Sequence, residues 1–194
     1  KNTQFVDNCG ADIWVVPPNT QLLQPGERLH IAVLTQARTT PGVLEAQPLL
    51  LTAATLRKPT GGSESISVVG VEVTSRLGRP WNVVAGDPRT LTMPDTMFFE
   101  DSQREKYGAM NLGSIREVNG HRVRVGGFTW GLVPFGPAYA FADADLARTL
   151  TGIASDRVSF VLVDVAPGTP VEDVRRALER RLPEALILTR EQFH

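Results

Sequence analysis

The last third of the chain carries the pattern that most restricts its fold. Two short apolar runs, 159–165 (SFVLVDV) and 185–188 (ALIL), flank a segment with helical periodicity. This order predicts a β-α-β unit, with parallel strands if the helix packs on a sheet that contains both. The two-residue link 183–184 leaves an antiparallel return open. The apolar positions of the segment fall on one helical face: Val171, Val174, Leu178 and Leu182.

The start of this helix also has a sequence signal. Thr169 and Glu172 have the spacing of a capping box, in which the hydroxyl oxygen and the carboxylate each accept a hydrogen bond from a backbone N–H of the first helical turn. Pro170 between them is suited to the first turn, since proline has no N–H to leave unpaired. We therefore expect the helix to begin at Thr169.

A second apolar run lies near the beginning of the chain. Residues 13–16 (IWVV) are β-branched or aromatic, and Pro17 and Pro18 cannot continue a ladder of hydrogen bonds. A run without polar alternation is typical of a strand that is covered on both faces. We expect an interior strand here.

The chain between these ends predicts further elements. Asn119-Gly120 is the strongest local signal, because this pair favours a two-residue hairpin turn and places Glu117 opposite Arg122. The other expected elements are a helix over 27–38, for which a strand over 30–34 (HIAVL) is the alternative, a long hairpin of 43–57 with 65–73, a short strand over 96–99, a polar helix over 100–108 and a helix capped by Asp143.

Composition excludes several classes of protein. Hydrophobic residues make up 42% and charged residues 21%, as in ordinary globular chains, and the net charge is -1 without a long basic block, so a nucleic-acid partner is not expected. One cysteine, Cys9, excludes an intramolecular disulfide, and its thiol is expected to be idle. No run of about 20 apolar residues that would cross a bilayer is present, which predicts a soluble chain.

Sequence motifs of catalysis and metal binding do not occur, so no cofactor or metal is expected. The acidic pairs 100–101 and 143–145 are interpreted as helix caps, although carboxylates could also serve acid-base chemistry. One alternative function is therefore a non-standard hydrolase with Glu100, Asp101 and His121. A soluble ligand-binding domain is a further alternative.

Aromatic residues gather in a glycine- and proline-rich passage over 126–141 (GGFTWGLVPFGPAYAF). A loop of this composition could project Phe128, Trp130 and Phe135, and exposed aromatic side chains are typical anchors for a partner or an apolar ligand. The alternative is that these three residues fill a core. They are the candidate contact residues of the chain.

Several motifs taken in order resemble a known family, the MacB-like periplasmic core domain of FtsX-like ABC transporter permeases, including DevC-type subunits. The resemblance covers nearly the whole chain and rests on the order of short motifs. These are ADIWVV (11–16), PGV (41–43), GRPWNVVAGD (78–87), LGSIREVNGHRVRVGGF (112–128), RVSFVLVDVAPG (157–168) and LTREQF (188–193).

The resemblance implies an α+β fold in which a split, porter-like α/β subdomain (1–75 and 142–194) carries an inserted, mostly β subdomain (76–141). It implies a non-catalytic domain on the periplasmic side of the cytoplasmic membrane, monomeric in isolation. This domain would bind a substrate or a periplasmic adaptor, and transmit movement driven by a separate ABC ATPase subunit or domain during export of peptides, antimicrobial peptides among them, lipids or drugs.

Overall fold

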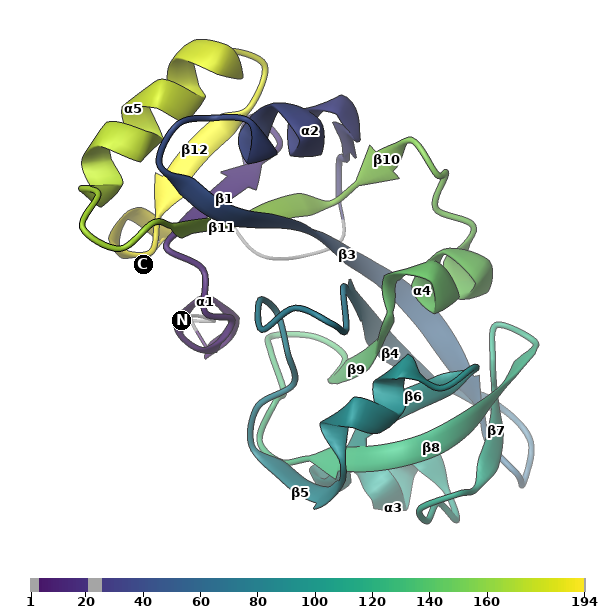
Figure 1. Cartoon of the computed structure of the whole chain (residues 1–194). Helices are drawn as coiled ribbons and strands as arrows, with labels where there is room; N and C mark the ends of the chain where they lie inside the picture. The colour runs from purple at the N-terminus through teal and green to yellow at the C-terminus, as the bar shows by residue number, and fades with distance from the viewer. Residues whose placement is uncertain (1–3, 21–25, 194) are drawn as a thin grey trace.

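The computed structural model describes residues 4–20 and 26–193, and the predicted α+β class is confirmed (Figure 1). The helices are α1 (Gln4–Asn8), α2 (Ala32–Arg38), α3 (Arg104–Tyr107), α4 (Ala144–Thr151) and α5 (Val171–Arg181), with 3-10 turns η1 (Pro88–Thr92), η2 (Asp101–Gln103) and η3 (Glu191–Phe193). The strands are β1 (Ile13–Val16), β2 (Leu29–His30), β3 (Val43–Arg57), β4 (Ser63–Val71), β5 (Val83–Gly86), β6 (Thr96–Glu100), β7 (Ile115–Val118), β8 (His121–Thr129), β9 (Tyr139–Asp143), β10 (Arg157–Val158), β11 (Phe160–Val165) and β12 (Leu186–Thr189).

One large mixed sheet organises the molecule. Its strand order is β12-β1-β11-β3-β4-β9-β6-β8-β5, and β7 pairs with both β3 and β8. Most neighbours are antiparallel, whereas β4 with β9 and β6 with β8 are parallel. Figure 1 shows the sheet passing from β12 and α5 at one end of the molecule to β5 and β8 at the other.

The C-terminal β-α-β unit is confirmed, and its strands are parallel to each other. Both β11 and β12 pair antiparallel with β1, which lies between them. The apolar face of α5 buries Val174 and Leu178 as expected. The crossover therefore spans one strand position, into which the N-terminal strand is inserted.

The predicted capping box at α5 is wrong. The residue that caps the helix is Pro170, whose side chain has no acceptor, so no side-chain cap bond forms. The Glu172 carboxylate instead accepts a hydrogen bond from Nε of Arg175 at 2.8 Å. An arginine one turn along the helix offers this carboxylate a charged partner, which competes with the backbone N–H of the cap.

The interior position of β1 is confirmed, and all four of its side chains are buried. Ile13 and Val15 belong to a hydrophobic cluster that includes α2, α4 and α5, whereas Trp14 and Val16 belong to a second cluster that includes Phe5. Each large side chain buried in this way contributes about 1.5–3 kcal/mol. The absence of polar alternation in IWVV therefore reflects two covered faces.

The second cluster is covered by a short helix that the sequence pattern did not indicate. Helix α1 buries Phe5 and Val6, and the Phe5 ring lies edge-on to Trp14 with centroids 5.9 Å apart. The Cys9 thiol after this helix is fully buried and donates to the carbonyl oxygen of Val6. Phe5, Val6 and Cys9, which lie among polar residues in the sequence, are thus part of the core.

The long hairpin is confirmed as β3 and β4, with pairing from Leu49–Val71 to Arg57–Ser63. Strand β3 has 15 residues, a length of about 50 Å at the usual rise of a strand. Its first part pairs with β11 and its later part with β4. Pro48 is tolerated because the pairing with β4 begins only at Leu49, so no ladder bond to β4 is required there.

The helix expected over 27–38 is shorter in the structure. Leu29–His30 forms β2 and pairs with β10, and the helix begins at Ala32. The alternative strand over 30–34 is correct for His30 alone, because 32–34 belong to the helix. The backbone N–H of Ala32 donates to Nδ1 of His30 at 3.1 Å. This imidazole takes one of the N–H groups that a helix start leaves unpaired.

Local predictions in the middle of the chain are confirmed. Asn119 and Gly120 have φ values of 49° and 80°, as a type I′ turn requires, and Glu117 lies opposite Arg122. The strand over 96–99 is β6, the polar helix is η2 with α3, and Asp143 caps α4 by accepting from the N–H of Asp145.

For description, residues 76–141 are called the central segment and the remaining described residues the flanking segments. The sheet is continuous across the two, because β9 pairs with β4 on one side and with β6 on the other. Both hydrophobic clusters also contain residues of both segments, for example Phe99 with Ile13 and Phe98 with Trp14. A division into two subdomains at these boundaries stays a prediction.

Candidate functional site

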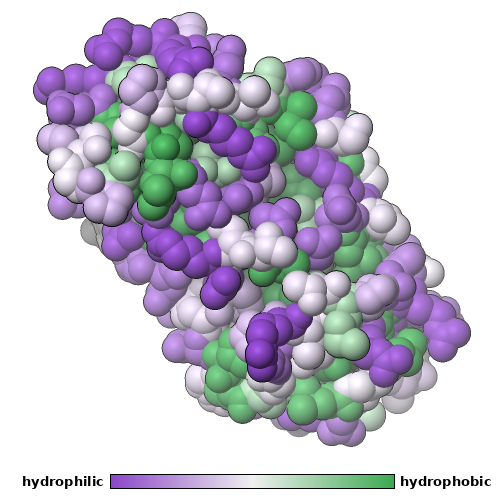
Figure 2. All heavy atoms as spheres, viewed as in Figure 1, coloured by the Kyte–Doolittle hydropathy of each residue, from purple (hydrophilic) through white to green (hydrophobic). Residues whose placement is uncertain are grey.

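Exposed apolar side chains are concentrated on the central segment. Figure 2 shows apolar atoms at the lower end of the molecule, where Figure 1 places β5, and a second apolar area at the upper left, near α5 and β12. Among the described residues, the large apolar side chains that are exposed in the flanking segments are Leu44 and Leu186. Those in the central segment are Val84, Met93, Leu112, Ile115, Trp130, Val133 and Phe135.

The three candidate contact residues differ in position. Trp130 is 53% exposed and Phe135 is 87% exposed, so both are available to a partner. Phe128 is only 1% exposed and belongs to the hydrophobic core, which excludes it from any contact surface. Trp130 and Phe135 therefore project from the loop, as the first interpretation of the aromatic passage expected. Phe128 instead fills the core, as the alternative expected.

The loop that carries Trp130 and Phe135, residues 130–138, is fixed to the body by a buried carboxylate. Glu100 is fully buried, and its Oε1 accepts from the backbone N–H of Leu132 at 2.9 Å and from the Thr129 hydroxyl at 3.2 Å. Its Oε2 accepts from the N–H and the hydroxyl of Ser102. Four donors therefore satisfy the carboxylate, and Leu132 is held between the two exposed aromatic residues.

Backbone and side-chain bonds hold the rest of the loop. The N–H of Trp130 donates to the carbonyl oxygen of Asn82 at 3.0 Å, and the Leu132 carbonyl oxygen accepts from the N–H of Tyr139 at 3.1 Å. The Ser67 hydroxyl of β4 donates to the carbonyl oxygen of Pro137 at 2.9 Å. The exposed aromatic residues thus stand on a loop that is anchored at both ends and in the middle.

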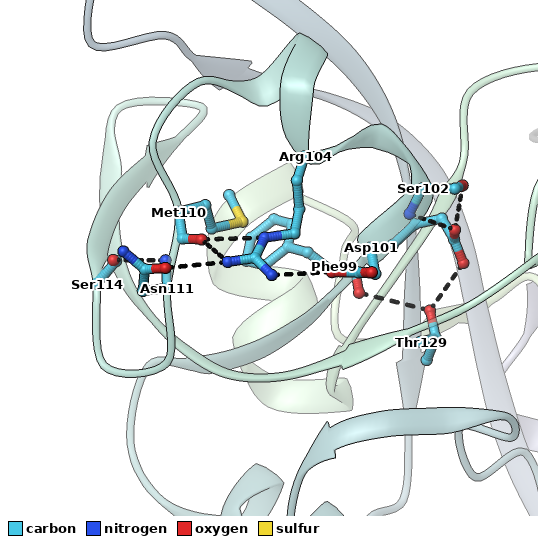
Figure 3. Close-up of polar contacts among 9 residues, drawn as sticks. Phe99, Asp101, Ser102, Arg104, Met110, Asn111, Ser114 and Thr129 are labelled. Atoms are coloured by element: carbon cyan, nitrogen blue, oxygen red, sulfur yellow. Dashed lines mark hydrogen bonds and ion pairs between the residues drawn. The ribbon is translucent and has the colours of Figure 1, made fainter.

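Arg104 packs against the ring of Phe128. Its guanidinium lies 4.2 Å from the centroid of the Phe128 ring, a distance typical of a cation–π contact. Figure 3 shows the same group bonded to the carbonyl oxygen of Met110, to Asn111 and to the carboxylate of Asp101 at 2.9 Å. The polar helical segment over 100–108 therefore covers part of the core through Arg104. Its sequence alone did not indicate this contact.

The residues proposed for a hydrolase do not converge. His121 lies at the start of β8, where its Nε2 is 2.8 Å from Oδ1 of Asp95. Glu100 lies at the end of β6 and pairs with Thr129, which is eight positions from His121 and therefore about 26 Å away along β8. Asp101 is engaged by Arg104. In the structure Glu100 caps a helical turn, as the helix-cap interpretation expected. It also anchors the loop through Leu132.

Other reactive groups offer no second site. Burial raises the pKa of the Cys9 thiol to about 11, so it is protonated and unreactive at neutral pH. Within residues 4–20 and 26–193, no three His, Cys, Asp or Glu side chains form a group that could hold a metal ion. The same residues include no helix with the length and apolar character needed to cross a bilayer.

Among the solved structures that share this fold are three domains of transporter or permease proteins. The periplasmic region of MacB from Actinobacillus actinomycetemcomitans matches with a TM-score of 0.66 and 11% identity, over 96% of this chain and 92% of that chain. The extracellular domain of the ABC-type transporter YknZ from Gram-positive bacteria matches with 0.60 and 13%, over 92% and 99%. A permease-protein domain from Porphyromonas gingivalis matches with 0.58 and 16%, over 92% and 87%.

No protein-family model matches the sequence, and the search of the curated proteins returns no match. At these identities the likeness concerns the fold. The chain has the fold of a MacB-like periplasmic core domain, and the resemblance indicated by the order of its motifs is confirmed at that level.

Proposed function

We propose that this chain is the extracytoplasmic domain of an ABC transporter permease, and that it binds a substrate or a periplasmic adaptor through the loop carrying Trp130 and Phe135. The observation that carries the proposal is the fold shared with the periplasmic region of MacB over 96% of the chain. The permease would be anchored in the cytoplasmic membrane. ATP hydrolysis would occur in a separate ATPase subunit or domain.

The exposed aromatic pair supports the binding part of this proposal. Trp and Phe side chains bury a large apolar area on contact and lose little conformational entropy, which makes them frequent anchors of interfaces. Here they stand on a loop fixed by Glu100, so little ordering is needed on binding. The bound molecule would be an apolar peptide, a lipid, a drug or an apolar patch of an adaptor.

The continuous sheet supports the transmission part. Strand β3 runs from the pairing with β11 to the pairing with β7 near its other end, so one strand connects the two ends of the molecule. Movement applied to the flanking segments would reach the central segment through paired strands rather than through a flexible linker.

Paired substitutions test the contact surface in the full-length permease. Replacing Trp130 and Phe135 by alanine should reduce export or adaptor capture at least about tenfold, since anchors of this type contribute 1.4 kcal/mol or more. The melting temperature of the domain should change little, because both side chains are exposed. The matched control replaces Leu44 and Leu186, the exposed apolar residues of the flanking segments, by alanine and should leave export unchanged.

Equal effects of the two double variants would contradict a specific contact at the loop. Membrane anchoring is tested separately by the gene sequence on both sides of residues 1 and 194. The proposal requires an apolar run of about 20 residues next to each end. Polar sequence on both sides would contradict it and favour a soluble ligand-binding domain.

A further inference from the structure

A basic groove lies at the end of the sheet where the β3–β4 turn meets β7. It has a volume of about 530 Å³, and Figure 1 places β7 far from both labelled ends of the chain. This groove is separate from the aromatic loop and has no role in the function proposed above. Its lining residues are Arg57, Lys58, Pro59, Ile115, Arg116, Glu117 and Arg122.

One wall of the basic groove is a buried cation without an acidic partner. Arg116 is 6% exposed, and its guanidinium donates to the backbone carbonyl oxygens of Arg57, Tyr107 and Ala109. In the described part of the chain it forms no ion pair with a carboxylate. Loss of solvation lowers the pKa of this guanidinium, and its hydrogen-bond acceptors are neutral carbonyl groups rather than carboxylates.

The other cations also exceed the acids around them. Glu117 is the acidic residue of the lining, and its carboxylate lies 3.4 Å from Nη1 of Arg57. Arg122 lies opposite Glu117 in the hairpin, so two arginines compete for one carboxylate. Lys58 reaches Glu64, outside the lining, at 3.7 Å. Four cations against one anion leave a lining charge of +3.

We propose that the basic groove binds a phosphate group. A phosphomonoester carries a charge of about -1.5 to -2 at pH 7 and three acceptor oxygens, which matches an excess of +3 better than a single carboxylate does. Guanidinium groups hold such oxygens with two parallel hydrogen bonds. Exposed Ile115 and Pro59 beside the cations accept an apolar part of the same molecule.

Titration of the chain with inorganic phosphate at fixed ionic strength, followed by backbone amide NMR shifts, tests the site. The shifts should concentrate on the amides of residues 57, 58 and 115–122. The variant Arg122→Ala should weaken binding about tenfold, as expected for the loss of a charged hydrogen bond. The variant Arg176→Ala removes the same charge from the exposed surface of α5 and should leave the affinity unchanged.

The variant Glu117→Gln gives the sharpest test, because it should strengthen phosphate binding several-fold. It removes the one carboxylate of the lining, and a variant that misfolds would not gain affinity. Shifts spread over the whole surface, or equal losses in Arg122→Ala and Arg176→Ala, would overturn the proposal.

Vesicles identify the source of the phosphate. Co-sedimentation with vesicles of phosphatidylcholine and phosphatidic acid, lost in Arg122→Ala, assigns a lipid headgroup. Binding of inorganic phosphate without vesicle binding assigns a soluble phosphate compound. Binding to neither probe contradicts the proposed site. None of these outcomes depends on the transport function, because the groove and the aromatic loop share no residue.

Discussion

The central segment and the flanking segments use their apolar residues differently. The flanking strand β1 buries all four side chains between two hydrophobic clusters, and the exposed face of α5 carries ion pairs such as Arg175 with Glu179. The central segment exposes Trp130 and Phe135 together with five other large apolar side chains. The flanking segments therefore bury most of their large apolar side chains, whereas the central segment presents an apolar surface that a partner can cover.

The exposure of apolar side chains in the central segment does not result from loose packing. The same segment contains the buried side chains of Phe98, Phe99 and Phe128, and Glu100 satisfies four donors in its interior. Exposed and buried aromatic residues are thus only two positions apart in the sequence.

The largest effect is expected from Gly86→Ala in the central segment. A Cβ at Gly86 would lie 2.2 Å from the carbonyl oxygen of Gly126, and its φ of 85° is strained for alanine. The free energy of unfolding should fall by at least about 4 kcal/mol, from backbone strain and overpacking together. Gly131→Ala is the matched control, since it has the same φ and open space, and should cost about 1 kcal/mol.

Hydrogen exchange of Gly86→Ala separates one folding unit from two. Because the sheet and both clusters continue across the segments, amide protection should fall in β1 and β11 as well as in β6 and β8. Loss of protection confined to the central segment would mean that the predicted subdomains fold independently, and the account of a shared frame would fail.

Glu100→Gln is expected to have the next largest effect. The amide keeps the shape of the side chain but replaces one acceptor oxygen by an NH2 group, which faces the donors of either Ser102 or Leu132. The unfolding free energy should fall by about 3 kcal/mol, measured by urea titration. Loop 130–138 should also lose amide protection first.

Asp143→Asn is the matched control for this change. Asp143 caps α4 through one bond to a backbone N–H, and asparagine caps a helix almost as well, so the stability should change by less than about 1 kcal/mol. A stability of Glu100→Gln equal to that of the native chain would show that the loop is not anchored by this carboxylate.

The smallest change in stability is expected from the titration of Cys9. The pKa of its thiol is raised by burial from 9.0 to about 11, so the folded state holds this proton more tightly than the unfolded state does. The resulting stability is fully present below pH 9 and is lost as the pH rises towards 11. Between pH 8 and pH 10 the loss should amount to about 1 kcal/mol.

Comparison of the native chain with Cys9→Ala isolates this contribution, because all other titrating groups are shared. The fall in unfolding free energy between pH 8 and pH 10 should be smaller in the variant by about 1 kcal/mol. A difference of the same size in both proteins would mean that Cys9 is not sealed in the flanking core.

Local patterns predicted much of the fold. Asn119-Gly120 specified its turn and the register of Glu117 with Arg122, and the apolar run of β1 specified an interior strand. These signals are carried by neighbouring residues. The order of motifs also indicated the shared fold, although no single motif is diagnostic.

The remaining features depend on contacts between distant residues, which spacing does not reveal. Glu100 meets Leu132 across 32 positions, and Arg104 covers Phe128, so neither the loop anchor nor the burial of Phe128 could be read locally. The prediction of a capping box was wrong because the Glu172 carboxylate accepts a hydrogen bond from Arg175 on the same helix. Helix α1 was not predicted because its buried face consists of only two residues, Phe5 and Val6, which are too few to give a helical periodicity.

Site-specific photo-crosslinking in cells tests the central claim most directly. A photoreactive amino acid is placed at Trp130, at Phe135, or at the control positions Leu44 and Leu186 in the full-length protein, all of them exposed. Crosslinked partner or substrate is expected from positions 130 and 135 and none from 44 and 186. Crosslinks from the control positions alone, or equally from all four, would contradict the assignment of recognition to the central segment.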